Sequence, residues 1–244
     1  MSGENNLLSG FFDMLNKFRK RMNFPIMLYG VIILFIFFGI ITGWRNVSGP
    51  NLQLILRNSA ILLLASIGMT MVILVSQVDL SIGSVMSMSA SISAVALASG
   101  IGTVPAIFLG LLCGVAVGAL NGVLVAVFRF DYWISTFATM GIGAGLSLVI
   151  ANGATIRIDN LAFSWLGSGR ILGIYLMVYL SAILVVIVGL LLKHTKFGYN
   201  IYSIGGSEQA ARLSGINVVK NRIAVYICSG FFSAIAGLVL AAIQ

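Results

Sequence analysis

Long, continuous apolar runs dominate the chain, and short stretches with charged residues, glycine, proline or asparagine separate them. A helix needs about 20 apolar residues to cross the roughly 30 Å of hydrocarbon in a bilayer. The runs do not alternate between apolar and polar positions, which argues against the strands of a membrane barrel. We therefore predict an all-α, polytopic helical membrane protein with about seven transmembrane segments. They lie near residues 25–43, 52–77, 81–98, 105–128, 133–151, 171–192 and 223–243.

Composition supports this fold class. Hydrophobic residues make up 59% of the chain and charged residues 8%, whereas soluble domains average about 45–50% and 25%. We expect one transmembrane domain at residues 25–244, preceded by a cytoplasmic segment at residues 1–24. Apolar residues in that segment follow a roughly helical spacing, which is typical of an amphipathic helix on a membrane surface. The apolar run after it is too long for a signal-peptide core and no small-x-small site follows, so we expect no cleaved leader.

The positions of lysine and arginine predict the orientation. If Met1 is cytoplasmic, most of the 14 basic residues lie on inner segments, as the positive-inside rule requires. The inner residues are Lys17, Arg19, Lys20, Arg21, Arg129, Lys193, Lys196, Arg212, Lys220 and Arg222; the outer ones are Arg45, Arg57, Arg157 and Arg170. The loop at residues 193–222 is therefore cytoplasmic. Attraction to anionic lipid explains the net charge of +8, and we expect no nucleic-acid partner.

Side chains that usually carry catalysis or bind metals are scarce. Cys113 and Cys228 lie in apolar runs without CxxC spacing, and the single His194 cannot build a metal cluster. The sequence shows no set of nucleophile, base and orienting residue, and no Walker-type nucleotide motif. We therefore expect a protein that is not an enzyme and that has no catalytic residues, metal or cofactor of its own.

Glycines spaced four residues apart predict close packing of helices. The GIGAGL stretch at 141–146 lacks the preceding strand and the later acidic residue of a dinucleotide site. We instead expect Gly141 and Gly145 to let helix backbones approach closely, as Gly114, Gly118 and Gly122 would.

Asp79 is the most informative single residue, because a carboxylate in hydrocarbon costs about 2.5 kcal/mol or more. One interpretation is a helix cap at the inner interface, where it accepts hydrogen bonds from the N–H groups of Ser81 and Ile82. The alternative is contact with a transported solute. The hydroxyl-rich segment that follows predicts either a helix shielded by its neighbours or a polar path lined by Ser81, Ser84 and Ser87.

The loop at 193–222 contains a short helix with defined ends. Gly205 and Gly206 break the chain, Ser207 can cap, and Glu208 can pair with Arg212 one turn later. Gly215 supplies the left-handed stop. A helix of about two turns is unstable alone, so we expect it to pack on its own bundle, on the membrane or on a partner protein.

Three stretches of sequence resemble the permeases of ribose-type ABC importers, which serve monosaccharides and related polyols. The stretches are TKFGYNIYSIGGSEQAARLSGI at 195–216, VDLSIG at 78–83, and Asn121-Gly122 followed by ISTFATM at 134–140. The likeness extends from about residue 50 to the end.

The resemblance implies a permease subunit in a bacterial cytoplasmic (inner) membrane. Its partners would be two ABC ATPase subunits, a second permease copy or a sister permease, an extracytoplasmic solute-binding protein and membrane lipid. ATP and magnesium would bind to the ATPase subunits. The residues implied to couple to the ATPase are Gly205, Gly206, Ser207, Glu208, Ala211, Arg212 and Gly215. Candidates for the translocation path or a helix cap are Asp79, Ser81, Ser84 and Asn121.

The chain also departs from the family pattern. Ser76-Gln77 replaces a usual Gly-Gly, and Asp131-Tyr132 stands where a proline is usual. Family members continue with a further membrane half, so we expect the chain to be a truncated or partial form. A branched-chain amino acid permease is a near alternative. An ion-coupled carrier or channel is a further alternative, for which Asp79 is the sole intramembrane candidate.

Overall fold

Each predicted apolar run forms a helix in the computed structural model, which describes residues 26–243. The chain divides into two units, residues 1–54 and 55–244. The predicted amphipathic segment at 1–24 lies outside the described residues. The first unit contains α2 (Ile26–Ile41), the 3₁₀ turn η1 (Arg45–Val47) and the start of α3 (Gly49–Leu74). Trp44 precedes η1 in a left-handed conformation, and the Asn46 amide donates to the carbonyl of Phe35 over 2.8 Å.

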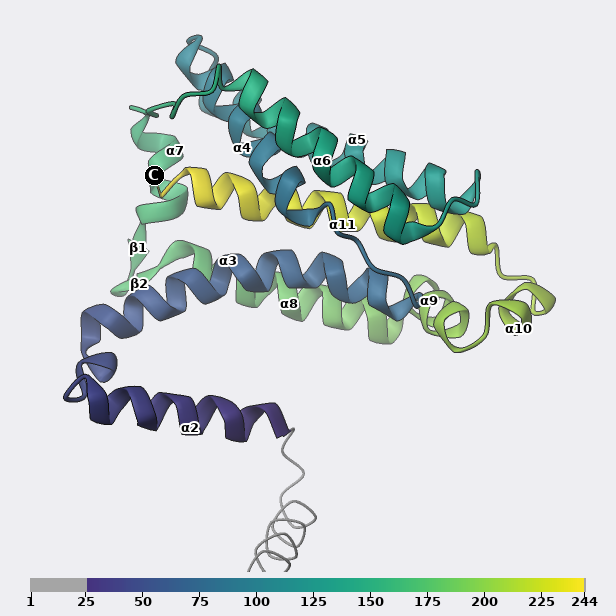
Figure 1. Ribbon diagram of the computed structural model, residues 1–244, viewed down its shortest axis with the longest axis horizontal. Helices are drawn as coiled ribbons and strands as arrows, with labels where there is room; N and C mark the ends of the chain where they lie inside the picture. Colours follow the sequence, from purple (N-terminus) through teal and green to yellow (C-terminus); the bar gives the residue numbers. More distant parts are fainter. Residues whose placement is uncertain (1–25, 244) are drawn as a thin grey trace, which may run out of the picture. The chain divides into compact units, whose positions relative to one another are not determined.

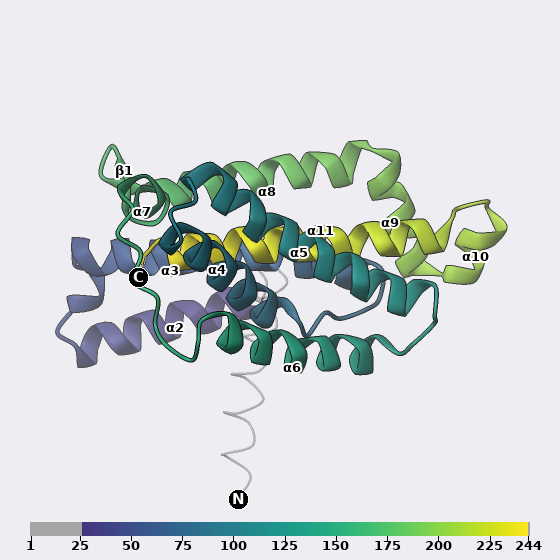
Figure 2. The same ribbon diagram turned by 90° about the horizontal axis from the view of Figure 1, so that it is seen from above.

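In Figures 1 and 2 the long helices of the second unit run roughly along one another. The remaining described helices all lie in this unit. They are α4 (Ile82–Ala98), α5 (Thr103–Ala126), α6 (Tyr132–Ile150), α7 (Leu161–Ser168), α8 (Leu176–His194), α9 (Lys196–Gly206), α10 (Glu208–Leu213) and α11 (Val218–Ala241). A hairpin of two short antiparallel strands, β1 (Arg170–Ile171) and β2 (Ile174–Tyr175), links α7 to α8. The sequence did not predict this hairpin or helices α7 and α9.

The all-α, polytopic prediction is confirmed. The helices that match the predicted runs are α2, α3, α4, α5, α6, α8 and α11. Five of them are long and apolar enough to cross a membrane: α3, α5, α6, α8 and α11. The apolar helices α2 and α4 are shorter.

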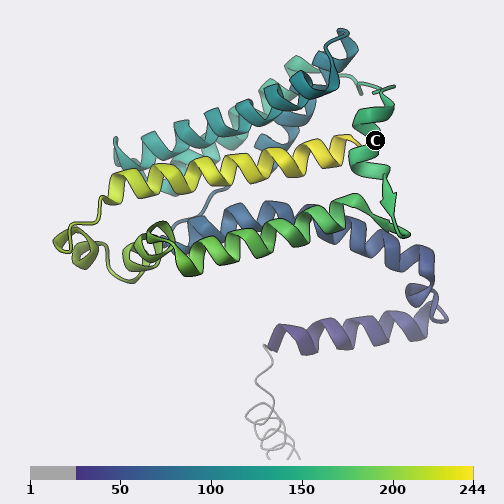
Figure 3. The ribbon, with the colours of Figure 1, turned by 180° about the vertical axis from the view of Figure 1, so that it is seen from behind.

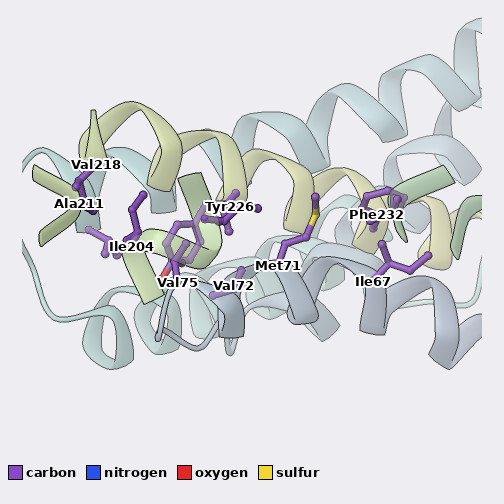
Figure 4. Close-up of a cluster of buried hydrophobic side chains, with 13 residues drawn as sticks. Ile67, Met71, Val72, Val75, Ile204, Ala211, Val218, Tyr226 and Phe232 are labelled. Atoms are coloured by element: carbon purple, nitrogen blue, oxygen red, sulfur yellow. The ribbon is translucent and has the colours of Figure 1, made fainter. Parts of the chain in front are cut away.

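Helix α11 forms the centre of the second unit. It lies between a layer of α4, α5 and α6 and a layer of α3 and α8, as Figures 1 and 3 show from opposite sides. The side of α11 that faces α3 contributes to a cluster of buried side chains. This cluster includes Met71 and Val72 of α3 and Tyr226 and Phe232 of α11 (Figure 4). Most other helices expose broad apolar surfaces, as expected for segments that face lipid. The buried core of the unit therefore lies around α11.

Glycines allow α5 to approach α11 closely. A Cβ atom at Gly114 would collide with the carbonyl of Gly230, and one at Gly118 would collide with the carbonyl of Tyr226. The sequence predicted this seam correctly. The matching prediction for Gly141 and Gly145 is wrong, because a Cβ atom at either position would meet nothing within 4 Å.

The glycine of α6 that packs closely is Gly143, where a Cβ atom would lie 2.9 Å from the Ser84 hydroxyl of α4. A four-residue spacing indicates that glycines share one face of a helix. It does not indicate which face meets a neighbour, and here the contacting face is the one that carries Thr139 and Gly143.

We predict that Gly118→Ala lowers the thermal stability of the purified chain, because the added methyl group forces α5 away from the backbone of α11. Overpacking of this kind costs about 1–3 kcal/mol. The matched control is Gly141→Ala, which adds the same group to an open helix face and should leave the melting temperature unchanged or slightly raised. Equal melting temperatures for the two variants would contradict the assigned seam.

Candidate functional site

The segment at residues 75–81 enters the bundle as irregular backbone between α3 and α4. Its side chains alternate, so that Val75, Gln77, Asp79 and Ser81 are buried. Ser76 turns the chain with a φ of 59°, and its hydroxyl donates to the carbonyl of Gly205 over 3.1 Å. A glycine would take this left-handed conformation without strain. The backbone conformation at this position therefore explains why the family usually has Gly-Gly here. Irregular backbone at membrane depth is tolerated where protein surrounds it.

The Asp79 carboxylate is enclosed and accepts three hydrogen bonds from neighbouring donors. It is 3% exposed. Its Oδ1 atom accepts from the backbone N–H of Ser81 over 2.9 Å and from the Ser81 hydroxyl over 2.6 Å. Its Oδ2 atom accepts from the Ser229 hydroxyl of α11 over 2.7 Å. Hydrogen bonds to a charged acceptor are stronger than neutral ones, so these donors offset much of the cost of burying the carboxylate.

Further hydrogen bonds connect this carboxylate to α5 and α6. The Asn121 amide of α5 donates to the Ser81 hydroxyl over 2.9 Å. The Thr139 hydroxyl of α6 donates to Asn121 Oδ1 over 2.6 Å. Ser81 and Asn121 are both completely buried. We call the five side chains of Asp79, Ser81, Asn121, Thr139 and Ser229 the polar node. It joins the start of α4 to three other helices.

Asp79 lies deeper than the sequence predicted. The expected position was the inner interface, but Ser229 is at the middle of α11. The difference arises because residues 75–81 extend into the bundle before α4 begins. Asp79 accepts from Ser81 as predicted for a cap, and within the described residues its bonded donors do not include the N–H of Ile82.

The serines expected to line a path or support the helix occupy different environments. Ser84 is buried beside Gly143, and its hydroxyl donates to the carbonyl of Ser81 over 2.8 Å. Ser87 is exposed one turn later. The shielded side of α4 thus includes Ser81 and Ser84, while Ser87 lies outside the packed bundle.

The second candidate region is α10, whose ends are built as predicted. The Ser207 hydroxyl accepts from the N–H of Ala210 over 3.3 Å and caps the helix. Gly215 has a φ of 78°. The N–H of Gly215 donates to the carbonyl of Arg212, and that of Ile216 donates to the carbonyl of Ala211, each over 3.0 Å. This pair of bonds is a Schellman motif, so the left-handed stop is confirmed.

Glu208 connects α10 to α11. It pairs with Arg212 over 2.6 Å within α10 and with Arg222 of α11 over 2.5 Å. The hydrogen bond from Arg212 is the main cause that lowers the pKa of the Glu208 carboxyl below its ordinary value; Arg222 adds to this effect and partial burial opposes it. The sequence predicted the pair with Arg212. The pair with Arg222 depends on how the chain folds back, which local spacing does not reveal.

The residues implied to couple to an ATPase divide into surface and packing positions. Gly206, Ser207, Arg212 and Gly215 are exposed, and Glu208 is half-buried. Ala211 is 3% exposed and packs in the core cluster around Met71 and Tyr226. Gly205 lies against the carbonyl of Leu74, where a Cβ atom would collide.

Sequence reasoning missed one exposed apolar residue in this region. Leu213 ends α10 with its side chain 84% exposed. The helix buries Ala211 and therefore turns Leu213 outward. A docking role for any of these residues stays a prediction.

We predict that Asp79→Asn folds with little loss of stability, because its amide oxygen can still accept from Ser81. Asp79→Leu should lower the free energy of unfolding by about 3 kcal/mol, since it leaves the buried groups of Ser81 and Ser229 without a partner. Thermal unfolding of both variants in the same detergent measures the difference. A leucine variant as stable as the asparagine variant would show that the polar node does not stabilise the fold.

The Glu208 ion pairs should give the protein a defined dependence on pH. A lowered pKa in the folded state means that stability is present above the ordinary glutamate value of about 4.3 and is lost as pH falls below it. We predict that the gap in melting temperature between the native chain and Glu208→Gln is constant above about pH 5 and shrinks below about pH 4.3. If the difference in melting temperature stays constant across this pH range, the ionised form of Glu208 does not stabilise the fold.

Comparison with known proteins gives consistent matches. Residues 51–244 match the family described as "Branched-chain amino acid transport system / permease component". The ribose import permease protein RbsC of Escherichia coli K12 is 36% identical over 193 residues, which are 78% of this chain and 60% of the relative. The fructose import permease protein FruF of Bifidobacterium longum is 36% identical over 197 residues, 79% of this chain and 55% of the relative.

A third relative is the L-arabinose ABC transporter permease protein AraH of Azospirillum brasilense, 34% identical over 199 residues, 81% of this chain and 57% of the relative. The chain thus spans between 55% and 60% of the length of these relatives. No solved structure gives a significant match. The matches confirm the resemblance to ribose-type permeases. With its apolar helices, the chain is a multi-pass protein of the cytoplasmic membrane, and it belongs to the permease family that it matches over residues 51–244.

Proposed function

We propose that the chain acts as the permease subunit of a binding-protein-dependent ABC importer for a monosaccharide or a related small polar solute. The relatives named as ribose, fructose and L-arabinose permeases support this solute class. The chain would form part of the translocation path and would not hydrolyse ATP. ATP and magnesium would bind to two separate ATPase subunits. A second permease copy or a sister permease and an extracytoplasmic solute-binding protein would complete the importer.

The observation that carries the proposal is the way α10 is attached to α11. The Glu208–Arg222 ion pair connects the two helices directly, and the buried Ala211 fixes the inner side of α10 against the core. The exposed side leaves Leu213 accessible to a partner, and the outer face of the Arg212–Glu208 pair lies beside it. A force applied to α10 would therefore act on the first turns of α11 rather than being absorbed by a loose loop.

Helix α11 would carry that displacement to the polar node. Ser229 lies at the middle of α11 and donates to Asp79, which precedes α4. A shift of packed helices against one another is an established way to transmit a switch. Movement of α11 would thus change the position of the start of α4. The side of α4 that carries Ser87 is exposed and would move with it.

The alternatives have less support. A branched-chain amino acid permease would fit the family's description, but the relatives named above import sugars. An ion-coupled carrier would need an intramembrane ionisable residue that can exchange ions. Both carboxylate oxygens of Asp79 are already bonded to serine donors, which favours a structural role.

Recovery of a co-expressed ATPase subunit with the purified permease tests this function. We predict that Leu213→Ala lowers the recovery about tenfold, because a buried apolar anchor in an interface contributes more than about 1 kcal/mol. The control is Leu161→Ala on α7, where the side chain is equally open at 92% exposure. This variant should recover the ATPase as the native chain does. Undiminished recovery with Leu213→Ala, or loss with both variants, would contradict docking through α10.

A further inference from the structure

A polar pocket opens beside α10 at the end of the bundle that the positive-inside rule assigns to the cytoplasm. It has a volume of about 500 Å³. Its lining comes from four parts of the chain that are distant in sequence: the segment after α3, the end of α5 with the loop that follows, α10, and the start of α11. The polar lining residues are Gln77, Arg129, Glu208, Arg212 and Arg222.

Positive charge exceeds negative charge in this pocket. Three arginines face one glutamate, and Glu208 is already shared between Arg212 and Arg222. Arg129 is exposed, and within residues 26–243 it forms no ion pair. Its backbone is left-handed, with a φ of 58°, and its side chain contributes to the lining of the pocket. The pocket therefore offers at least one uncompensated guanidinium group to an anion.

Two buried polar atoms in the lining lack hydrogen-bond partners among the described residues. One is Oε1 of Gln77, a side chain that is only 7% exposed. The other is Nε of Arg222. A buried polar atom without a partner costs about 1–3 kcal/mol. The two atoms require opposite partners, because Nε–H must donate a hydrogen bond and the amide oxygen must accept one. A ligand that carries both an anionic oxygen and a hydroxyl group would satisfy both.

Exposed aromatic side chains lie close to Arg129 in the chain. Phe128 and Phe130 flank Arg129, stack with their ring centroids 6.1 Å apart, and are both largely exposed. Trp133 is also exposed at the start of α6. Tryptophan gathers where hydrocarbon meets water, which agrees with the exposed Trp133, and basic pockets on the cytoplasmic side of helix bundles can bind acidic headgroups.

We propose that this pocket binds a phosphate group, carried either by an anionic phospholipid headgroup or by a soluble phosphate. Arginine matches phosphate oxygens with its fork of N–H donors, so Arg129 and Arg222 would hold the anionic oxygens. A hydroxyl of the ligand would donate to Gln77 Oε1. Because Glu208 and Arg212 of α10 line the pocket, an occupied site would stabilise the position of the helix proposed to dock. The proposal itself needs only the isolated chain and does not depend on ATPase coupling.

The test measures ligand-induced shifts in the melting temperature of the full chain, purified in a neutral detergent. One arm adds phosphatidylglycerol, with phosphatidylcholine as the neutral-headgroup control. A second arm adds inorganic phosphate, with sodium chloride at equal ionic strength as its control. Stabilisation by phosphatidylglycerol alone would assign a lipid headgroup, and stabilisation by inorganic phosphate would assign a soluble ligand.

We expect Arg129→Gln to weaken the binding of whichever probe stabilises the native chain about tenfold, because the substitution removes one hydrogen bond to a charged group. The matched control is Lys220→Gln, which removes an exposed cation from the start of α11 without changing the lining of the pocket. Gln77→Glu gives an independent check, because its carboxylate would occupy the free guanidinium groups and should also weaken binding.

Two results would overturn the proposal. Equal weakening by Arg129→Gln and Lys220→Gln would show general attraction to a basic surface instead of a site. If neither probe binds and Arg129→Gln instead abolishes recovery of the ATPase subunit, the pocket accepts a protein carboxylate and not a phosphate.

Discussion

The buried carboxylate of Asp79 is the constraint on which the arrangement of the helices depends. A charge at this depth is costly unless several donors surround it, and the donors are the backbone and hydroxyl groups of Ser81 and the hydroxyl of Ser229. Bringing them together requires the chain to leave α3 early, extend to the middle of α11 and begin α4 there. The polar node therefore determines where α4 starts and which side of α11 it meets.

Close packing around α11 makes this arrangement possible. The glycines of α5 remove the side chains that would separate it from α11, and Gly68 of α3 lies where a Cβ atom would be 2.8 Å from Cα of Ser229. In a bilayer, where lipid is as apolar as leucine, such contacts and interhelical hydrogen bonds provide most of the association energy. The same helix that is tightly packed at its centre receives the Glu208 ion pair at its beginning, so α10 and the polar node both contact α11.

Local features of the sequence were sufficient to predict the helices of the seven apolar runs and the ends of α10. Ser207 and Gly215 act within one turn of their own positions, so their chemistry can be read from neighbouring residues. Ser229 could not be identified in this way, because it meets Asp79 from 150 positions away. For the same reason the spacing of Gly141 and Gly145 indicated a packed face where the fold instead uses Gly143. Leu213 gave no signal either, since a single leucine in an apolar chain looks like a core residue until the burial of Ala211 fixes the rotation of the helix.

The central claim is that α11 relays the displacement of α10 to the polar node. Hydrogen exchange of the backbone amides, measured with and without a bound ATPase subunit, tests it most directly. We predict that binding changes the exchange of residues 79–84 and 225–233 as well as that of α10, and that Arg222→Gln confines the change to α10. Changes restricted to residues 206–215 in the native chain would contradict the relay.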